Sequence, residues 1–217
     1  MQPKTQYMER FIMQDLIAWK NREDRKPLIL LGARQVGKTY ILKEFGQREF
    51  ENVAYINCDN NAMAKDLFAS DYNIDRILLT IGAITGVNIE AGKTLIIMDE
   101  IQELHRGLAS LKYFCENARE YHVAVAGSLL GLALHQGESY PVGKVNTLEM
   151  YPMTFEEFLW ARGFKQRMDL LQHGMWDVVK SLRTLYIQHL REYYLVGGMP
   201  EAVNKFIETN DANAVRE

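Results

Sequence analysis

Between positions 28 and 150, apolar residues fall into short unbroken runs that are separated by helical spacings. Unbroken apolar runs with branched side chains are typical of strands buried on both faces, as in a parallel sheet. Segments in which apolar residues recur every three or four positions predict helices between those strands. This alternation predicts an α/β domain in which helices flank a parallel sheet. The expected strands begin at Leu28, Val53, Thr94, His122 and Val145.

Helices are expected before and between these strands. The segment Tyr7–Asn21 places apolar residues at helical spacing, which indicates a helix that packs on the core. Phe11 and Ile12 in that helix are also candidates for contact with an adenine base, although a core role is the simpler interpretation. Further helices are expected over Ala62–Ala69, Ile74–Ile84 and Gly107–Glu120.

The pattern becomes purely helical after residue 151. Thr154 and Glu157 have the spacing of a capping box, which starts a helix. We therefore expect an α/β core with its N-terminal helix at residues 1–151, and a small helical, lid-like subdomain at residues 152–217. The glycines and proline of residues 197–200 interrupt the last helices as a hinge or a tight turn. The later helices are expected over Met168–Gln172, Trp176–Tyr194 and Glu201–Ile207.

A glycine-rich segment, GARQVGKT at Gly32–Thr39, follows the first strand directly. Its glycines allow backbone N–H groups to curl around an anion, and the helix expected from Lys38 adds its positive N-terminal end. Lys38 can reach the β and γ phosphates of a nucleotide, and the Thr39 hydroxyl can bind Mg²⁺. This is the P-loop, or Walker A, pattern in a strand-to-helix context. The expected nucleotide-binding residues are Gly32, Ala33, Arg34, Gln35, Val36, Gly37, Lys38, Thr39 and Tyr40.

Two carboxylates end the third strand, which reads TLIIMDE from Thr94 to Glu100. A buried strand does not normally end in two adjacent acids without a cation or a polar partner, because unpaired buried charge is costly. Taken alone, Asp99 would suggest a helix cap, but beside a P-loop the pair is typical of a Walker B element. Asp99 then binds Mg²⁺ through water, with Thr39 as the second metal residue, and Glu100 orients or polarises the attacking water.

Polar residues also end the second and fourth strands. Ser128 follows the strand His122–Ala126 and is expected to sense the γ-phosphate or the attacking water, and to cap the next helix. Asp59 follows the second strand, where it either lies near the nucleotide or caps a helix. The expected catalytic residues are therefore Lys38, Glu100 and Ser128.

Composition and charge change this picture little. Apolar residues make up 47% and charged residues 24% of the 217 positions, as in ordinary globular proteins. The net charge of −3 argues against a dominant nucleic-acid-binding surface. Cys58 and Cys115 lack metal-ligand spacing and are expected to be free thiols. No apolar run approaches the length of a membrane span and no secretory signal opens the chain, so we expect a cytoplasmic protein without a membrane partner.

Five motifs occur in a specific order along the chain: GARQVGKT at Gly32–Thr39, LIIMDEIQ at Leu95–Gln102, AGSLLG at Ala126–Gly131, PVGKVNTLEMYPMTFEEFL at Pro141–Leu159 and YLVGGMPEAV at Tyr194–Val203. In this combination the chain resembles the prokaryotic AAA-type ATPases of the AAA+ superfamily that usually carry a C-terminal nuclease-like domain. The resemblance implies a five-stranded sheet in the order 5-1-4-3-2, ATP and Mg²⁺ as ligands, and ATP hydrolysis as the reaction.

Two departures from that family bear on partners. Many relatives have Gly-Arg where this chain has Gly143-Lys144, and an arginine there would suit a finger that reaches a neighbouring subunit. Lysine offers a point charge without the bidentate fork, so Lys144, like Arg34, is a candidate phosphate sensor or a surface cation. Family members usually continue past this length, so we expect the C-terminal domain to be missing here. Besides ATP, the expected partners are further copies of the chain and a protein or DNA bound through the missing domain.

The preferred interpretation is an ATPase that couples Mg²⁺-dependent hydrolysis to a conformational change acting on an unknown partner. The main alternative is a nucleotide-gated switch that binds ATP with little turnover. A small-molecule kinase would bring arginines over the transferred phosphate, and the sequence has no arginine-rich lid. A nucleic-acid-binding module is disfavoured by the acidic balance of the chain.

Overall fold

The computed structural model describes residues 8–59, 61–65, 67–68, 71–128 and 141–215 of the chain. It divides into two compact units. One unit is Ile12–Met150, and the other joins Met1–Phe11 to Tyr151–Glu217. Among the described residues, no helix combines the length and the apolar character that crossing a membrane requires.

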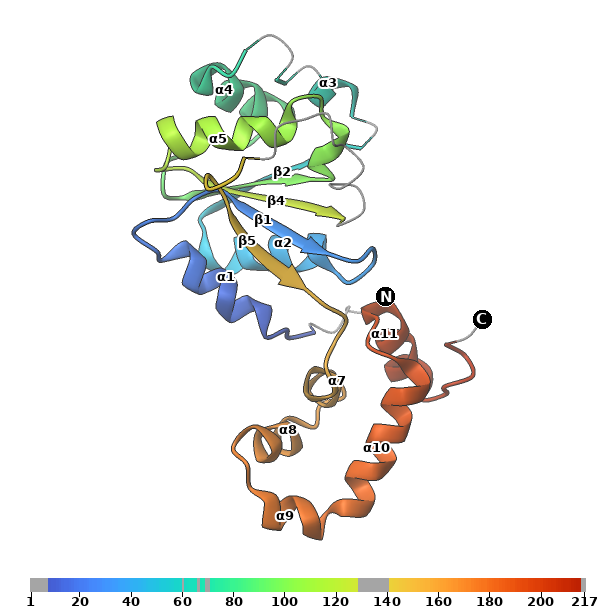
Figure 1. Ribbon diagram of the computed structural model, residues 1–217. Coiled ribbons are helices and arrows are strands. Elements are labelled where there is room, and N and C mark those ends of the chain that lie inside the picture. The colour runs from blue at the N-terminus through green and yellow to red at the C-terminus, as the bar shows by residue number, and fades with distance from the viewer. Residues whose placement is uncertain (1–7, 60, 66, 69–70, 129–140, 216–217) are drawn as a thin grey trace. The chain divides into compact units, whose positions relative to one another are not determined.

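A five-stranded parallel sheet forms the centre of the first unit. The strands lie in the order β2-β3-β4-β1-β5, which confirms the expected order 5-1-4-3-2. All four neighbouring pairs are parallel, so the carboxyl ends of the strands meet at one edge (Figure 1). The strands are β1 (Leu28–Gly32), β2 (Asn52–Asn57), β3 (Thr94–Asp99), β4 (His122–Ser128) and β5 (Asn146–Met150).

Helices cover both faces of this sheet and give the unit three layers. Helices α4 (Ile74–Thr85) and α5 (Gly107–Asn117) lie on one face, where alternate strand residues such as Ile96 contribute to an apolar core (Figure 1). Helices α1 (Ile12–Lys20) and α2 (Lys38–Glu49) lie on the other face. The three-layer α/β fold expected from the sequence is confirmed.

Several helix ends differ from the expectation. Helix α1 begins at Ile12 rather than Tyr7, and α5 ends at Asn117 rather than Glu120. Helix α3 (Ala62–Lys65) is short, and its cap is Asn61, whose Oδ1 accepts from the Ala64 amide at 3.1 Å. Asp59 is therefore not the cap of this helix.

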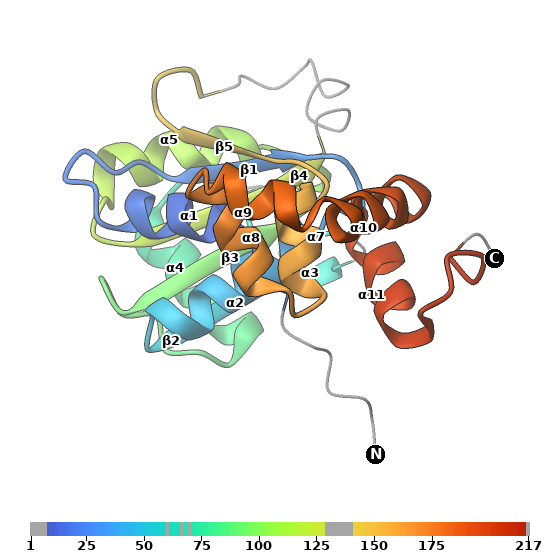
Figure 2. The same ribbon diagram turned by 90° about the horizontal axis from the view of Figure 1, so that it is seen from below.

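The second unit is helical. In Figure 2, α7 and α8 lie side by side and α10 leads from α9 to α11. The prediction of a single helix over Trp176–Tyr194 is wrong, because the helix is interrupted at Leu182. The Ser181 hydroxyl donates to the Val178 carbonyl at 2.7 Å and so competes for a backbone acceptor in the last turn of α9. The helices are α7 (Phe155–Ala161), α8 (Lys165–Gln172), α9 (Trp176–Ser181), α10 (Arg183–Val196) and α11 (Pro200–Thr209).

A buried carboxylate ties the N-terminal segment to this helical unit. Thr154 and Glu157 form the expected capping box at the start of α7. The Glu157 carboxylate also accepts from the Phe11 amide at 2.8 Å and lies 3.1 Å from Arg10 Nε. The Phe11 ring packs 6.0 Å from that of Trp160, centre to centre. Residues 8–11 therefore belong to the unit that follows residue 150.

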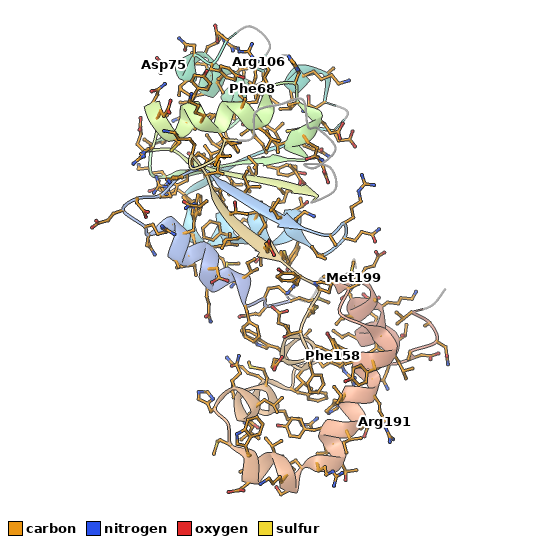
Figure 3. All side chains as sticks on the ribbon, viewed as in Figure 1. Phe68, Asp75, Arg106, Phe158, Arg191 and Met199 are labelled. Atoms are coloured by element: carbon orange, nitrogen blue, oxygen red, sulfur yellow. The ribbon has the colours of Figure 1, made fainter. Side chains whose placement is uncertain are left out.

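Apolar packing and one close backbone approach hold the remaining helices together. The Phe158 side chain lies among the helices of the unit, whereas Arg191 on α10 points away from them (Figure 3). The Met153 amide donates to the Gly198 carbonyl at 2.6 Å. A Cβ at Gly198 would lie 2.3 Å from the Met153 oxygen. Of the two expectations for residues 197–200, this anchoring favours a tight turn over a hinge.

Candidate functional site

The P-loop connects β1 to α2 at the carboxyl edge of the sheet. Gly32 pairs with Met150 in the neighbouring strand, and a Cβ at Gly32 would lie 2.3 Å from the Met150 carbonyl oxygen. Gln35 and Gly37 have left-handed φ values of 65° and 94°, which turn the chain back toward α2. The N-cap residue of α2 is Gly37, which has no side chain with which to cap the helix. Its first amides therefore present the positive helix end to an anion.

The Lys38 ammonium folds back over this loop. Lys38 Nζ donates to the carbonyl oxygens of Gly32, at 3.0 Å, and Ala33, at 2.7 Å. Burial lowers the pKa of Lys38, and the carboxylates of Glu100 and Asp99 oppose that effect. The side chain is 7% exposed, so a cation stands beside the anion cradle in a largely water-free position.

Two hydroxyl groups converge on the Asp99 carboxylate. Thr39 Oγ1 donates to Asp99 Oδ2 at 2.6 Å, and Tyr55 Oη donates to the same oxygen at 3.2 Å. Burial, followed by the Asp99 charge, raises the pKa of Tyr55 to about 12, so its hydroxyl stays protonated. Burial, together with the Asp99 and Glu100 carboxylates, raises the pKa of the nearby Cys58 thiol to about 12. Cys58 is therefore a neutral thiol rather than a nucleophile.

Glu100 is held by its own turn. It follows β3 with a left-handed φ of 53° and precedes a short 3₁₀ helix at Ile101–Glu103. Gln102 Nε2 donates to Glu100 Oε2. The Gln102 amide oxygen is buried and has no hydrogen-bond partner within the described part of the chain. Gln102 thus fixes the Glu100 carboxylate in a defined position.

This donor set suits Mg²⁺ bound together with a nucleotide. Within the described ranges, no group of three or more His, Cys, Asp or Glu side chains could hold a metal ion. Mg²⁺ is usually held by one or two carboxylates, with waters and substrate phosphates completing its octahedron. The Asp99 carboxylate and the Thr39 hydroxyl, in direct contact beside a phosphate-binding loop, fit that requirement.

The structure brings most of the expected site residues to one edge of the sheet. Ser128 also reaches this edge, because its backbone pairs with Gly32 at the ends of β4 and β1. The Ser128 side chain, and the helix expected from Leu129 and Leu130, lie outside the described residues. The Arg34 side chain is exposed on the loop, and Asp59 is exposed beyond β2.

Lys144 lies elsewhere in the unit. It precedes β5, whose first residue Asn146 pairs with Leu28 at the amino end of β1. Its ammonium is 2.8 Å from the Glu116 carboxylate. The P-loop follows the opposite end of β1, so of the two alternatives left open for Lys144 the structure favours a surface cation over a phosphate sensor in the same P-loop.

Sequence reasoning missed Tyr55 and Gln102. A signal for Tyr55 existed, because a tyrosine within a buried strand needs a partner for its hydroxyl and the neighbouring strand ends in carboxylates. Its separation of 44 positions from Asp99 hid the pairing. Gln102 gave no comparable signal, since a glutamine after a strand is usually exposed.

This chain has relatives among known proteins. Residues 24–159 match a family model described as AAA domain. Uncharacterized protein MJ1637 of Methanocaldococcus jannaschii is 28% identical, and the match covers 83% of this chain and 39% of that protein. This chain therefore spans less than half the length of that relative.

Similar solved structures are also known. The Thermotoga maritima RuvB Holliday junction branch migration motor has 18% identity and a TM-score of 0.44, covering 76% of this chain and 52% of that chain. The Aeropyrum pernix ORC1 protein in complex with DNA has 13% identity and a TM-score of 0.43, covering 77% of this chain and 52% of that chain. This chain spans about half the length of either structure.

Proposed function

The chain belongs to the AAA domain family, and from that premise we propose that it binds ATP with Mg²⁺ and hydrolyses it to ADP and phosphate. The observation that carries the proposal is the 2.6 Å contact between the Thr39 hydroxyl and the Asp99 carboxylate. It joins a phosphate-binding loop to a metal-binding acid at one edge of the sheet. Glu100 follows Asp99 directly, where it would act on water.

Each part of the site has a role in this proposal. The amides of residues 32–40 hold the phosphates, and Lys38 leaves the loop carbonyls to bind the β and γ phosphates. Thr39 and Asp99 would hold Mg²⁺, which would neutralise charge on the phosphates. Glu100 orients or polarises the attacking water, and Ser128 senses the γ-phosphate or that water. The protein therefore works by positioning and by charge neutralisation.

The wider setting is also proposed. The helical part at residues 152–217 would act as a lid whose movement couples the ATP cycle to a protein or DNA partner. The family resemblance supports assembly of several copies and a place among the AAA-type ATPases that usually carry a C-terminal nuclease-like domain. A cytoplasmic location belongs to the same proposal.

Steady-state phosphate release from ATP and Mg²⁺ tests the hydrolysis step. Lys38→Ala should weaken ATP binding about 10- to 100-fold, because it removes charge-assisted hydrogen bonds. Glu100→Gln should retain ATP binding but lose at least about a hundredfold in turnover, because it removes the general base. Glu103→Gln, at an exposed position three residues on, is the matched control. Equal phosphate release from all three variants and the unmodified chain would refute the proposal.

One observation favours a second candidate, a nucleotide-gated switch with little turnover. The hydrogen bond from Gln102 occupies the Glu100 carboxylate that hydrolysis requires. Gln102→Ala frees this carboxylate and should raise turnover if the bond restrains it. Tight ATP binding without phosphate release, in both the unmodified chain and Gln102→Ala, would favour the switch over the ATPase.

A further inference from the structure

Tyr55 lies on the face of the sheet that α2 covers. The neighbouring positions Ala54 and Ile56 belong to the apolar core on the opposite face. Val53, two positions before Tyr55, faces α2, because a Cβ at Gly46 would lie 2.6 Å from Val53 Cγ2. Side chains alternate along a strand, so the Tyr55 ring also lies between β2 and α2.

A cation from α2 covers the Tyr55 ring. Lys43 Nζ lies 3.5 Å from the ring centre, within the range of a cation–π interaction. Lys43 follows Thr39 by one helical turn, so both residues lie on the same side of α2. The ring is thus placed between the helix that carries Thr39 and the strand next to Asp99.

The Tyr55 hydroxyl reaches forward along the neighbouring strand. Tyr55 is paired in register with Ile97, yet its hydroxyl bonds to Asp99, two residues further along β3. Thr39 donates to the same carboxylate oxygen. Two hydroxyl donors from two different elements therefore set the orientation of one carboxylate, and a phenylalanine at position 55 would provide the same packing without this bond.

We propose that Tyr55 is a positioning residue that holds the Asp99 carboxylate in the orientation required to bind Mg²⁺. This inference rests on the proposed ATPase site and adds a residue to it. Partners that hydrogen-bond to a metal-binding carboxylate typically contribute about 10- to 100-fold to metal affinity. The partly exposed position and the 3.2 Å length of the Tyr55 bond place its effect at the lower end of that range.

The test is a Mg²⁺ titration of the full chain with a fluorescent, non-hydrolysable ATP analogue. Tyr55→Phe removes one hydroxyl and should raise the half-saturating Mg²⁺ concentration about tenfold. Binding of the analogue in excess EDTA should stay unchanged, because no metal is involved. Tyr113→Phe is the matched control, since Tyr113 lies on α5 and stacks on Tyr72.

Asp99→Asn, measured in parallel, separates the inference from the proposed function. If Asp99→Asn abolishes the effect of Mg²⁺ and Tyr55→Phe matches the unmodified chain, the positioning role of Tyr55 is overturned while the metal site stands. If Asp99→Asn retains the full effect of Mg²⁺, the metal site itself is wrong. A Tyr55→Phe variant that loses turnover at an unchanged Mg²⁺ requirement also overturns the positioning role.

Discussion

His122 should make the α/β unit sensitive to mild acid. This side chain on β4 is 6% exposed and lies between the rings of Trp19 and Phe50, at 6.0 and 4.8 Å between centres. Burial, with the nearby Arg25 and Lys20 charges, lowers the pKa of His122 from 6.5 to about 4. Its Nδ1 has no hydrogen-bond partner among the residues that the structure describes.

The sign and size of the effect follow from this difference in pKa. As the pH falls below 6.5, His122 becomes protonated in the unfolded chain, whereas in the folded protein it stays neutral until the pH approaches 4. The free energy of unfolding therefore drops across that window and levels off below it. Between about pH 7.5 and about pH 5 the loss from this group is about 2 kcal/mol.

Urea unfolding at these two pH values checks the prediction. Trp19 contacts His122, so its fluorescence reports this region once Trp160 and Trp176 are replaced by phenylalanine. In that background, His122→Phe removes the titrating group and should reduce the drop in unfolding free energy by about 2 kcal/mol. His105→Gln, at an exposed histidine, is the control. An equal drop with and without His122 would refute the reasoning.

Two further predictions concern a close approach and a buried ion pair. Gly32→Ala places a methyl group 2.3 Å from the Met150 oxygen and should weaken ATP binding at least about tenfold by displacing the P-loop. The control is Gly86→Asn, at a left-handed turn with open space around it, which should leave ATP binding unchanged. Equal ATP binding by the two variants would contradict the predicted clash. Glu157→Ala removes the ion-pair partner of Arg10, which keeps its hydrogen bond to the Tyr151 carbonyl, and also removes the capping box of α7 and the acceptor of the Phe11 amide. It should lower the free energy of unfolding in urea by about 3–5 kcal/mol, and a cost under about 1 kcal/mol would contradict this prediction.

The strands and the P-loop were predictable because their signals are local. An apolar run such as Leu28–Leu31, short and followed by a glycine-rich segment, is typical of a buried strand. The P-loop glycines allow backbone conformations that other residues rarely adopt. Asp99 and Glu100 stood out because buried acids need partners. The order of the strands came from the family resemblance, since periodicity does not specify which strands are neighbours.

The remaining details depend either on local geometry that residue types do not reveal or on contacts between distant parts of the chain. Asn61 and Asp59 are equally good caps by type, and the local turn geometry favours Asn61. The helix is interrupted at Leu182 without a glycine or proline at that point, so the amino-acid composition did not predict the interruption. The contact between Tyr55 and Asp99 can be recognised only when β2 is known to lie beside β3. Residues 8–11 read as the start of α1 but are held by Glu157, which follows them by nearly 150 positions.

That last contact has a consequence for how the protein is made. The α/β unit is one continuous stretch, so it can fold as soon as residue 150 has left the ribosome. The helical unit is built from both ends of the stretch described, and Phe11 waits for a partner synthesised 146 residues later. At ordinary translation speeds of about 5–20 residues per second, that wait is roughly 7–30 s. Arg10 and Phe11 therefore reach their native contacts only after that interval, and a chaperone that holds this segment has the same interval in which to act.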